Sequence, residues 1–200
     1  MIPSPIQRVA AEIDALPGVG PRAALRYAYW LVTQPRERLV RFAQALLSLR
    51  EEIRICETCG NWSDSETCSI CRDASRDHSK ICVVATPQDL QTIDGSGGYK
   101  GVYHVLGGLL DPIEGRTPDT LRIKALFARI REGGAAVKEI ILAFDPDVSG
   151  DTTSLYLTRQ LGGVDITITR LARGLPNGAQ LEYADSATIA EAMENRKITG

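Results

Sequence analysis

Two close cysteine pairs constrain the fold of this 200-residue chain more than any other feature. Cys56 and Cys59 form one C-x-x-C pair, and eight residues later Cys68 and Cys71 form another. Four soft sulfur ligands on two tight turns are typical of a tetrahedral structural Zn²⁺ site, here one per chain. Residues 53–79 are too polar to bury a core, so metal binding would supply their folding free energy, on the order of 10 kcal/mol. A redox C-x-x-C pair or an iron–sulfur cluster is the alternative.

The rest of the composition favours a globular cytoplasmic protein. Hydrophobic residues make up 44% and charged residues 24% of the chain, which excludes wholesale disorder. No apolar run approaches the roughly 18 residues of a membrane span, and the N-terminus lacks the apolar core of a signal peptide. A disulfide framework is therefore not expected. The fifth cysteine, Cys82, lies in the apolar run 81–85 and is expected to be a buried thiol.

The first 50 residues indicate three helices and a local positive charge. Short helices are predicted over 6–16 and 22–33, and a third follows Pro35 over about 36–52. Apolar residues of the third helix recur with the spacing of one buried face: Leu39, Phe42, Ala43, Leu46 and Leu47. The chain has a net charge of −2, but this region has seven arginines and three acidic residues. Any nucleic-acid binding would therefore use a local patch.

A glycine turn joins the first two predicted helices. In the segment LPGVGPR, Gly18 and Gly20 permit positive φ angles and let backbone N–H groups approach a partner without a Cβ in the way. Arg22 and Arg26 lie one helical turn apart just beyond it. The pattern predicts the hairpin of a helix-hairpin-helix motif, which binds phosphate backbones without reading bases. The alternative is a plain corner between helices with solvated arginines.

The chain changes character from Lys80 onward. Apolar runs of strand length, at 81–85, 102–106, 138–144 and 164–169, alternate with helical stretches near 87–94, 119–132 and 151–161. Strands separated by helices predict right-handed crossovers and a parallel sheet covered on both faces. A short terminal helix is predicted near 186–195. The fold class is therefore mixed α and α/β.

Acidic residues follow the third of these apolar runs. Asp145, Asp147 and Asp151 would lie at the carboxyl end of a parallel strand, where α/β folds bind ligands. Their oxygens could hold Mg²⁺. The alternative is a loop in which Asp151 caps the helix that follows. No phosphate-binding loop of the ATPase type occurs in the chain.

Several segments, taken in order, carry a resemblance that covers nearly the whole chain. They are LPGVGPR, the four cysteines, ICVV, GYKGVYHVLGG and ARGLPNGAQLEYAD. The chain closely resembles the bacterial recombination mediator RecR family. The resemblance implies a helix-hairpin-helix region (1–52), a C4 zinc finger (53–79), a Toprim domain with a Rossmann-like parallel sheet (80–173) and a C-terminal tail (174–200).

The resemblance also implies a function in DNA repair and recombination. Members of the family bind single- and double-stranded DNA, form a tetrameric ring, and act with RecO and RecF to help load RecA on gapped or single-stranded DNA. The family's DNA contacts fall on Arg22 and Arg26. Contact with RecO falls near Tyr99, Gly101 and Tyr103. The protein is expected to be nucleoid-associated and not to be an enzyme.

Two departures from related patterns bear on catalysis. Catalytic Toprim domains carry a glutamate at the end of the first strand, which this family usually keeps, whereas this chain has Ala85 there. Conversely, Asp145 and Asp147 stand where the family usually lacks the full acidic pair. A methyl group cannot transfer a proton, so a non-catalytic scaffold is favoured. The alternatives are a Mg²⁺-dependent Toprim nuclease or primase-like enzyme, and a zinc module that binds only proteins.

Overall fold

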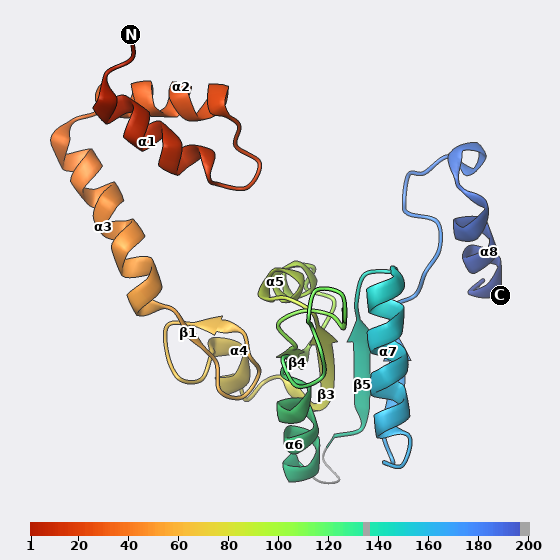
Figure 1. Ribbon diagram of the computed structural model, residues 1–200. Coiled ribbons are helices and arrows are strands. Elements are labelled where there is room, and N and C mark those ends of the chain that lie inside the picture. Colours follow the sequence, from red (N-terminus) through yellow and green to blue (C-terminus); the bar gives the residue numbers. More distant parts are fainter. Residues whose placement is uncertain (134–136, 197–200) are drawn as a thin grey trace. The chain divides into compact units, whose positions relative to one another are not determined.

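The computed structural model describes residues 1–133 and 137–196 and divides into two compact units, Met1–Ile53 and the chain from Arg54 onward (Figure 1). In the first unit, α1 (Ser4–Asp14) packs on α2 (Pro21–Val32). Their contact is built on Ala10, Ala24 and Ala28, whose small side chains let the two backbones approach closely. Pro21 opens α2, as expected for a residue whose fixed φ suits the first helical turn.

The third helix, α3 (Arg36–Glu52), has the predicted bounds but not the predicted burial. All of α3 lies in the described part of the chain, and none of its residues is buried. Phe42 and Leu46 are more than half exposed, and Leu47 is 72% exposed. The apolar periodicity correctly predicts a helix. The expectation of a buried face was wrong for the single chain, because no other segment of this unit covers that face.

A four-stranded parallel sheet forms the centre of the second unit. Its strands run in the order β4–β3–β5–β6, as the predicted crossovers require. Their bounds are β3 (Asp77–Val84), β4 (Gly101–Val105), β5 (Glu139–Ala143) and β6 (Thr167–Arg170). The connecting helices are α5 (Pro87–Gly95), α6 (Ile123–Gly133) and α7 (Val148–Leu161). The predicted α/β class is confirmed.

The side chains of β3 point alternately to the two faces of the sheet, so the core of this unit has two parts. Ile81 and Val83 belong to the cluster formed with apolar residues of α6 and α7. Cys82 and Val84 belong to a second cluster, which includes Leu90 of α5 and three of the paired cysteines. Because successive side chains of a strand point to opposite faces, α6 and α7 cover one face, while α5 and the cysteine-rich segment cover the other.

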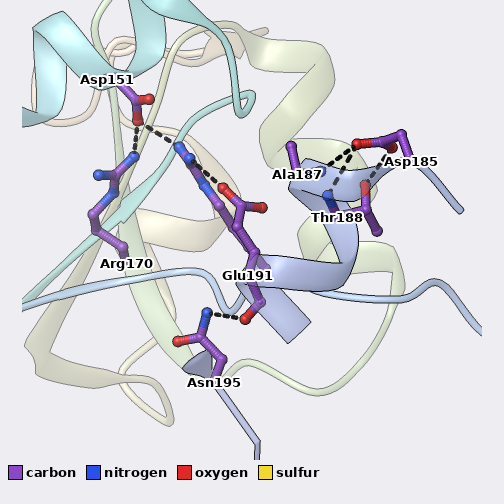
Figure 2. Close-up of polar contacts among 8 residues, drawn as sticks. Asp151, Arg170, Asp185, Ala187, Thr188, Glu191 and Asn195 are labelled. Atoms are coloured by element: carbon purple, nitrogen blue, oxygen red, sulfur yellow. Dashed lines mark hydrogen bonds and ion pairs between the residues drawn. The ribbon is translucent and has the colours of Figure 1, made fainter. Parts of the chain in front are cut away.

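The chain ends in a short helical tail. After β6 come a 3₁₀ turn, η2 (Leu181–Tyr183), and α8 (Ser186–Glu194), close to the predicted helix. Asp185 caps α8 by accepting hydrogen bonds from the Ala187 and Thr188 amides, each at 3.0 Å (Figure 2). None of the helices in the described residues is long and apolar enough to cross a membrane.

Candidate metal centre and nucleic-acid interface

The four paired cysteines converge as predicted. Strands β1 (Arg54–Ile55) and β2 (Trp62–Ser63) form a small hairpin that carries the first pair, and the short α4 (Ser69–Arg72) carries the end of the second. All four sulfurs lie within 4.8 Å of one another, and the Cys59 and Cys68 sulfurs are 3.6 Å apart. Zn–S bonds of about 2.3 Å in a tetrahedron place sulfurs about 3.8 Å apart, so the set fits zinc.

Burial and crowding affect the protonation of the cysteines. Contact with Cys68 and Cys71, together with burial, raises the pKa of the Cys59 thiol. Zn²⁺ would offset this effect and hold all four sulfurs as thiolates. Four protein ligands leave no open position, so the zinc is structural.

Two residues that sequence reasoning missed fix the cysteine knuckle to the sheet. Gly60 adopts φ +79°, and a Cβ there would lie 2.7 Å from the Val105 carbonyl oxygen. This close approach lets the Val105 amide donate to the Cys59 carbonyl at 2.7 Å. Arg122 donates from its guanidinium to the Glu57 carbonyl at 3.1 Å. A glycine directly after a cysteine pair could have signalled the first contact. Nothing local in the sequence signals the second.

The glycine turn takes the form of a tight hairpin between α1 and α2. Gly18 has φ +78°, a conformation that favours glycine, and the Val19 amide donates to the Leu16 carbonyl at 3.1 Å. Gly20 is extended, with φ −105°, and precedes α2 as its N-terminal cap. A Cβ on either glycine would meet no atom within 4 Å, so the turn is open on its outer side. Gly20 therefore provides access rather than a special backbone angle.

Arg22 and Arg26 extend from the face of α2 next to this turn. Both residues are exposed. Within residues 1–133 and 137–196, neither guanidinium has a carboxylate within 4.0 Å. Exposed positive charges without an acidic neighbour remain available to an external anion. The geometry is that expected of a phosphate-binding face.

The acidic residues after β5 do not form one ligand set. Asp145 and Asp147 line a cavity of about 240 Å³ at the carboxyl ends of β3 and β5, together with Ala85, Thr86, Asp89, Gly108, Leu109, Asp111, Arg116 and Ser149. Asp147 caps α7, because its Oδ1 accepts from the Gly150 amide at 2.7 Å. The suggestion that Asp151 caps this helix was wrong: α7 begins at Val148, three residues earlier.

Asp151 is committed elsewhere. It pairs with Arg170 and, at 2.5 Å, with Arg173, which also contacts Glu191 of α8 at 3.1 Å (Figure 2). Hydrogen bonds from Arg173 and then Arg170 hold the pKa of Asp151 below its usual value. Within the part of the chain that the structure describes, the four cysteines are the one group of three or more His, Cys, Asp or Glu side chains close enough to share a metal. Asp151 therefore does not complete a set of three carboxylates with Asp145 and Asp147.

The residues suggested for partner contact have internal roles. Tyr103 is fully buried, and its hydroxyl donates to Asp94 Oδ1 at 3.2 Å. Gly101 is also buried, and a Cβ there would collide with the Tyr99 hydroxyl. That hydroxyl lies 3.0 Å from the Lys80 carbonyl oxygen. In the chain by itself Tyr103 has no exposed surface, because β4 is covered by α5 and the cysteine-rich segment. Tyr99 is half-buried at the rim.

Comparison with known families agrees with this architecture. Four family models match in order: the RecR helix-hairpin-helix (residues 6–49), the RecR zinc finger domain with four cysteines (53–73), the Toprim domain (79–172) and the RecR C-terminal region (174–197).

Full-length relatives give the same assignment. Recombination protein RecR of Desulforudis audaxviator is 45% identical over 192 residues, covering 96% of both chains. The Myxococcus xanthus protein of the same name is 43% identical, covering 98% of this chain and 99% of the relative. That of Treponema denticola is 46% identical, covering 96% and 97%. The chain belongs to the RecR family of recombination proteins, with a structural zinc site and a role in DNA recombination and repair.

Proposed function

We propose that this protein is a non-catalytic DNA-binding mediator that acts with RecO and RecF to help load RecA on gapped or single-stranded DNA. The observation that carries the proposal is the pair Arg22 and Arg26, exposed beside an open glycine turn and free of carboxylates among the described residues. We expect such a face to bind the sugar-phosphate backbone rather than base edges. Binding is then independent of sequence and weakens with salt, by about 0.7 to 0.9 in log affinity per phosphate contact.

Assembly into a ring would concentrate these arginines. A cavity of about 380 Å³ in the first unit is lined almost entirely by apolar side chains: Ile13, Leu16, Tyr27, Trp30, Leu31, Leu39 and Phe42, with Arg38 at its edge. A second copy of the chain is the occupant that we propose, in a homotetramer. Symmetry would then gather the basic patches of several subunits around one strand of DNA, although each chain has a net charge of −2. Such a protein would be nucleoid-associated.

Docking of RecO is proposed at the rim beside β4. Tyr99 is half-buried and Lys100 is exposed there, whereas Gly101 and Tyr103 support the rim from within. The buried pair sets the shape of this edge rather than contacting the partner.

The cavity after β3 supports the non-catalytic part of the proposal. Ala85 supplies a methyl group where general acid–base chemistry would need a carboxylate, and Asp147 is used as a helix cap. Incubation with single- and double-stranded DNA in Mg²⁺ or Mn²⁺ is expected to give no product. Metal-dependent cleavage that is lost in Asp145→Ala would instead establish the Toprim nuclease.

The DNA-binding face is tested by charge reversal. The double variant Arg22→Glu with Arg26→Glu is expected to lose DNA binding at low salt while keeping its helical content and zinc. Arg131→Glu with Arg159→Glu changes the net charge equally on exposed residues of the second unit and serves as the matched control. Normal binding by the first variant, or equal loss in both, would show that the turn is not the interface. If the wild type itself does not bind DNA at low salt, a module that binds only proteins is favoured.

A further inference from the structure

Helix α2 exposes three neighbouring aromatic side chains. Tyr27, Tyr29 and Trp30 are 44–48% exposed, although large apolar rings usually lie inside a domain. Two of them are accounted for within the chain. The Arg26 guanidinium lies 5.3 Å from the centre of the Tyr27 ring, and that of Arg38 lies 4.8 Å from the centre of the Trp30 ring. Both rings also line the apolar cavity of this unit.

Tyr29 differs from its two neighbours in each respect. It does not line that cavity, and within the described residues no guanidinium stacks on its ring. It follows Arg22 by seven residues and Arg26 by three, a spacing that places all three on one face of the helix. The phosphate-binding face thus includes an uncovered aromatic ring.

The spacing along this face matches a nucleic-acid strand. At about 1.5 Å of rise per residue, Arg22, Arg26 and Tyr29 span roughly 10 Å along the helix axis. Three stacked nucleotides, at about 3.4 Å each, cover the same length. Guanidinium groups hold phosphates, and an aromatic ring stacks on the face of any base, so the combination is a binding platform for an unpaired strand.

We propose that Tyr29 stacks on an unpaired base of single-stranded DNA whose phosphates are held by Arg22 and Arg26. This inference rests on the proposed function and adds a preference that phosphate contacts alone do not provide. In a duplex, the base faces are covered by neighbouring base pairs, so the ring gains nothing there. Tyr29 therefore discriminates an unpaired strand from duplex DNA without reading its sequence.

The experiment compares three ligands of equal length in the full-length protein: oligothymidylate, an abasic strand with the same phosphates, and a duplex. Tyr29→Ala is expected to weaken binding of oligothymidylate about 5- to 150-fold, the equivalent of one lost base stack. Binding of the abasic strand and the duplex stays at the wild-type level, and the salt dependence is unchanged. Tyr29→Phe, which keeps the ring, binds like the wild type, as does the control Tyr183→Ala, which removes an exposed tyrosine of the tail.

Three results would overturn the proposal. The first is wild-type affinity of Tyr29→Ala for oligothymidylate. The second is an equal loss of affinity for all three ligands in Tyr29→Ala, which would mean that the ring only positions the helix. The third is a changed solution mass, which would assign Tyr29 to contact with another copy of the chain or another protein.

The double variant Arg22→Glu with Arg26→Glu separates this inference from the function beneath it. If this variant binds none of the three ligands, the phosphate-binding face is supported regardless of the result for Tyr29→Ala. If that variant binds normally while Tyr29→Ala fails on oligothymidylate alone, the arginine assignment falls and base stacking stands.

Discussion

At the scale of single residues, His104 shows how burial sets the charge state of a side chain. It lies in the centre of β4 with no exposed surface, and its Nε2 is 3.0 Å from the Arg122 carbonyl oxygen. Burial, opposed in part by that hydrogen bond, lowers the pKa of His104 to about 4. The neutral ring donates from Nε2, and a charged ring would be buried near the guanidinium groups of Arg122 and Arg129.

This shift makes stability depend on pH. The neutral form is favoured in the folded state, so the contribution of His104 is complete above its unfolded pKa of about 6.5. It is lost as pH falls toward 4, with a total of about 3 kcal/mol. We expect His104→Gln, which keeps a donor for the Arg122 carbonyl, to be less stable than the wild type at pH 7. The difference in free energy of unfolding between the two proteins should shrink by roughly that amount from pH 7 to pH 4.

Denaturant unfolding at each pH measures the effect. Zinc content must be followed in parallel, because protonation of the cysteines also releases metal at acid pH. A stability difference that stays constant across this range would contradict the assigned charge state.

At the scale of elements, the zinc finger is part of the core of the sheet rather than an appendage. Three of its cysteines are buried in one cluster with Cys82, Val84 and Tyr103. The finger also supplies the Cys59 carbonyl that accepts from Val105, at the outer edge of β4. An edge strand presents unpaired backbone groups. The finger pairs with the outer edge of β4, as a further strand would.

Removal of zinc should therefore expose one edge of the sheet selectively. We expect chelation, or Cys68→Ser, to accelerate hydrogen exchange at the Val105 amide and along β4 at least tenfold, since the knuckle loses the metal that folds it. Strand β6, at the opposite edge, keeps its wild-type protection. Cys82→Ala removes a buried thiol that is not a ligand and should retain zinc. Unchanged exchange of β4 in zinc-free protein would show that the finger folds without metal.

Local patterns predicted most of these elements, and long-range contacts account for what they missed. The spacing of apolar residues predicted the bounds of α3, and the C-x-x-C pairs predicted the metal ligands, because both signals lie within a few residues. The role of Asp151 was not readable, since its partners Arg170 and Arg173 lie about twenty residues later and meet it only once β6 is in place. Burial of Tyr103 likewise depends on the separate segments that cover β4.

At the scale of the whole molecule, the exposed apolar side of α3 supports the proposed contact with other copies of the chain. A contiguous apolar surface exposed to water is costly, and its burial between subunits would recover about 25 cal/mol per Å². In the proposed assembly, the apolar periodicity of α3 would find the cover that the single chain does not provide. Phe42 joins this face to the apolar cavity of the first unit, so the two form one candidate interface.

This interface links assembly to DNA binding. We expect the wild type to have the solution mass of a tetramer, and Leu46→Glu with Leu47→Glu to shift it to smaller species, because charge in an apolar contact is strongly unfavourable. DNA affinity should fall with it, and the salt dependence should become shallower, since fewer arginines reach one strand at a time. Ile113→Glu with Leu181→Glu, at apolar residues that are 98% and 65% exposed in the second unit, adds the same charge as the matched control and should alter neither property. If the double variant kept full mass, or dissociated while holding DNA as tightly as before, convergence of arginines from several subunits could not be the source of affinity.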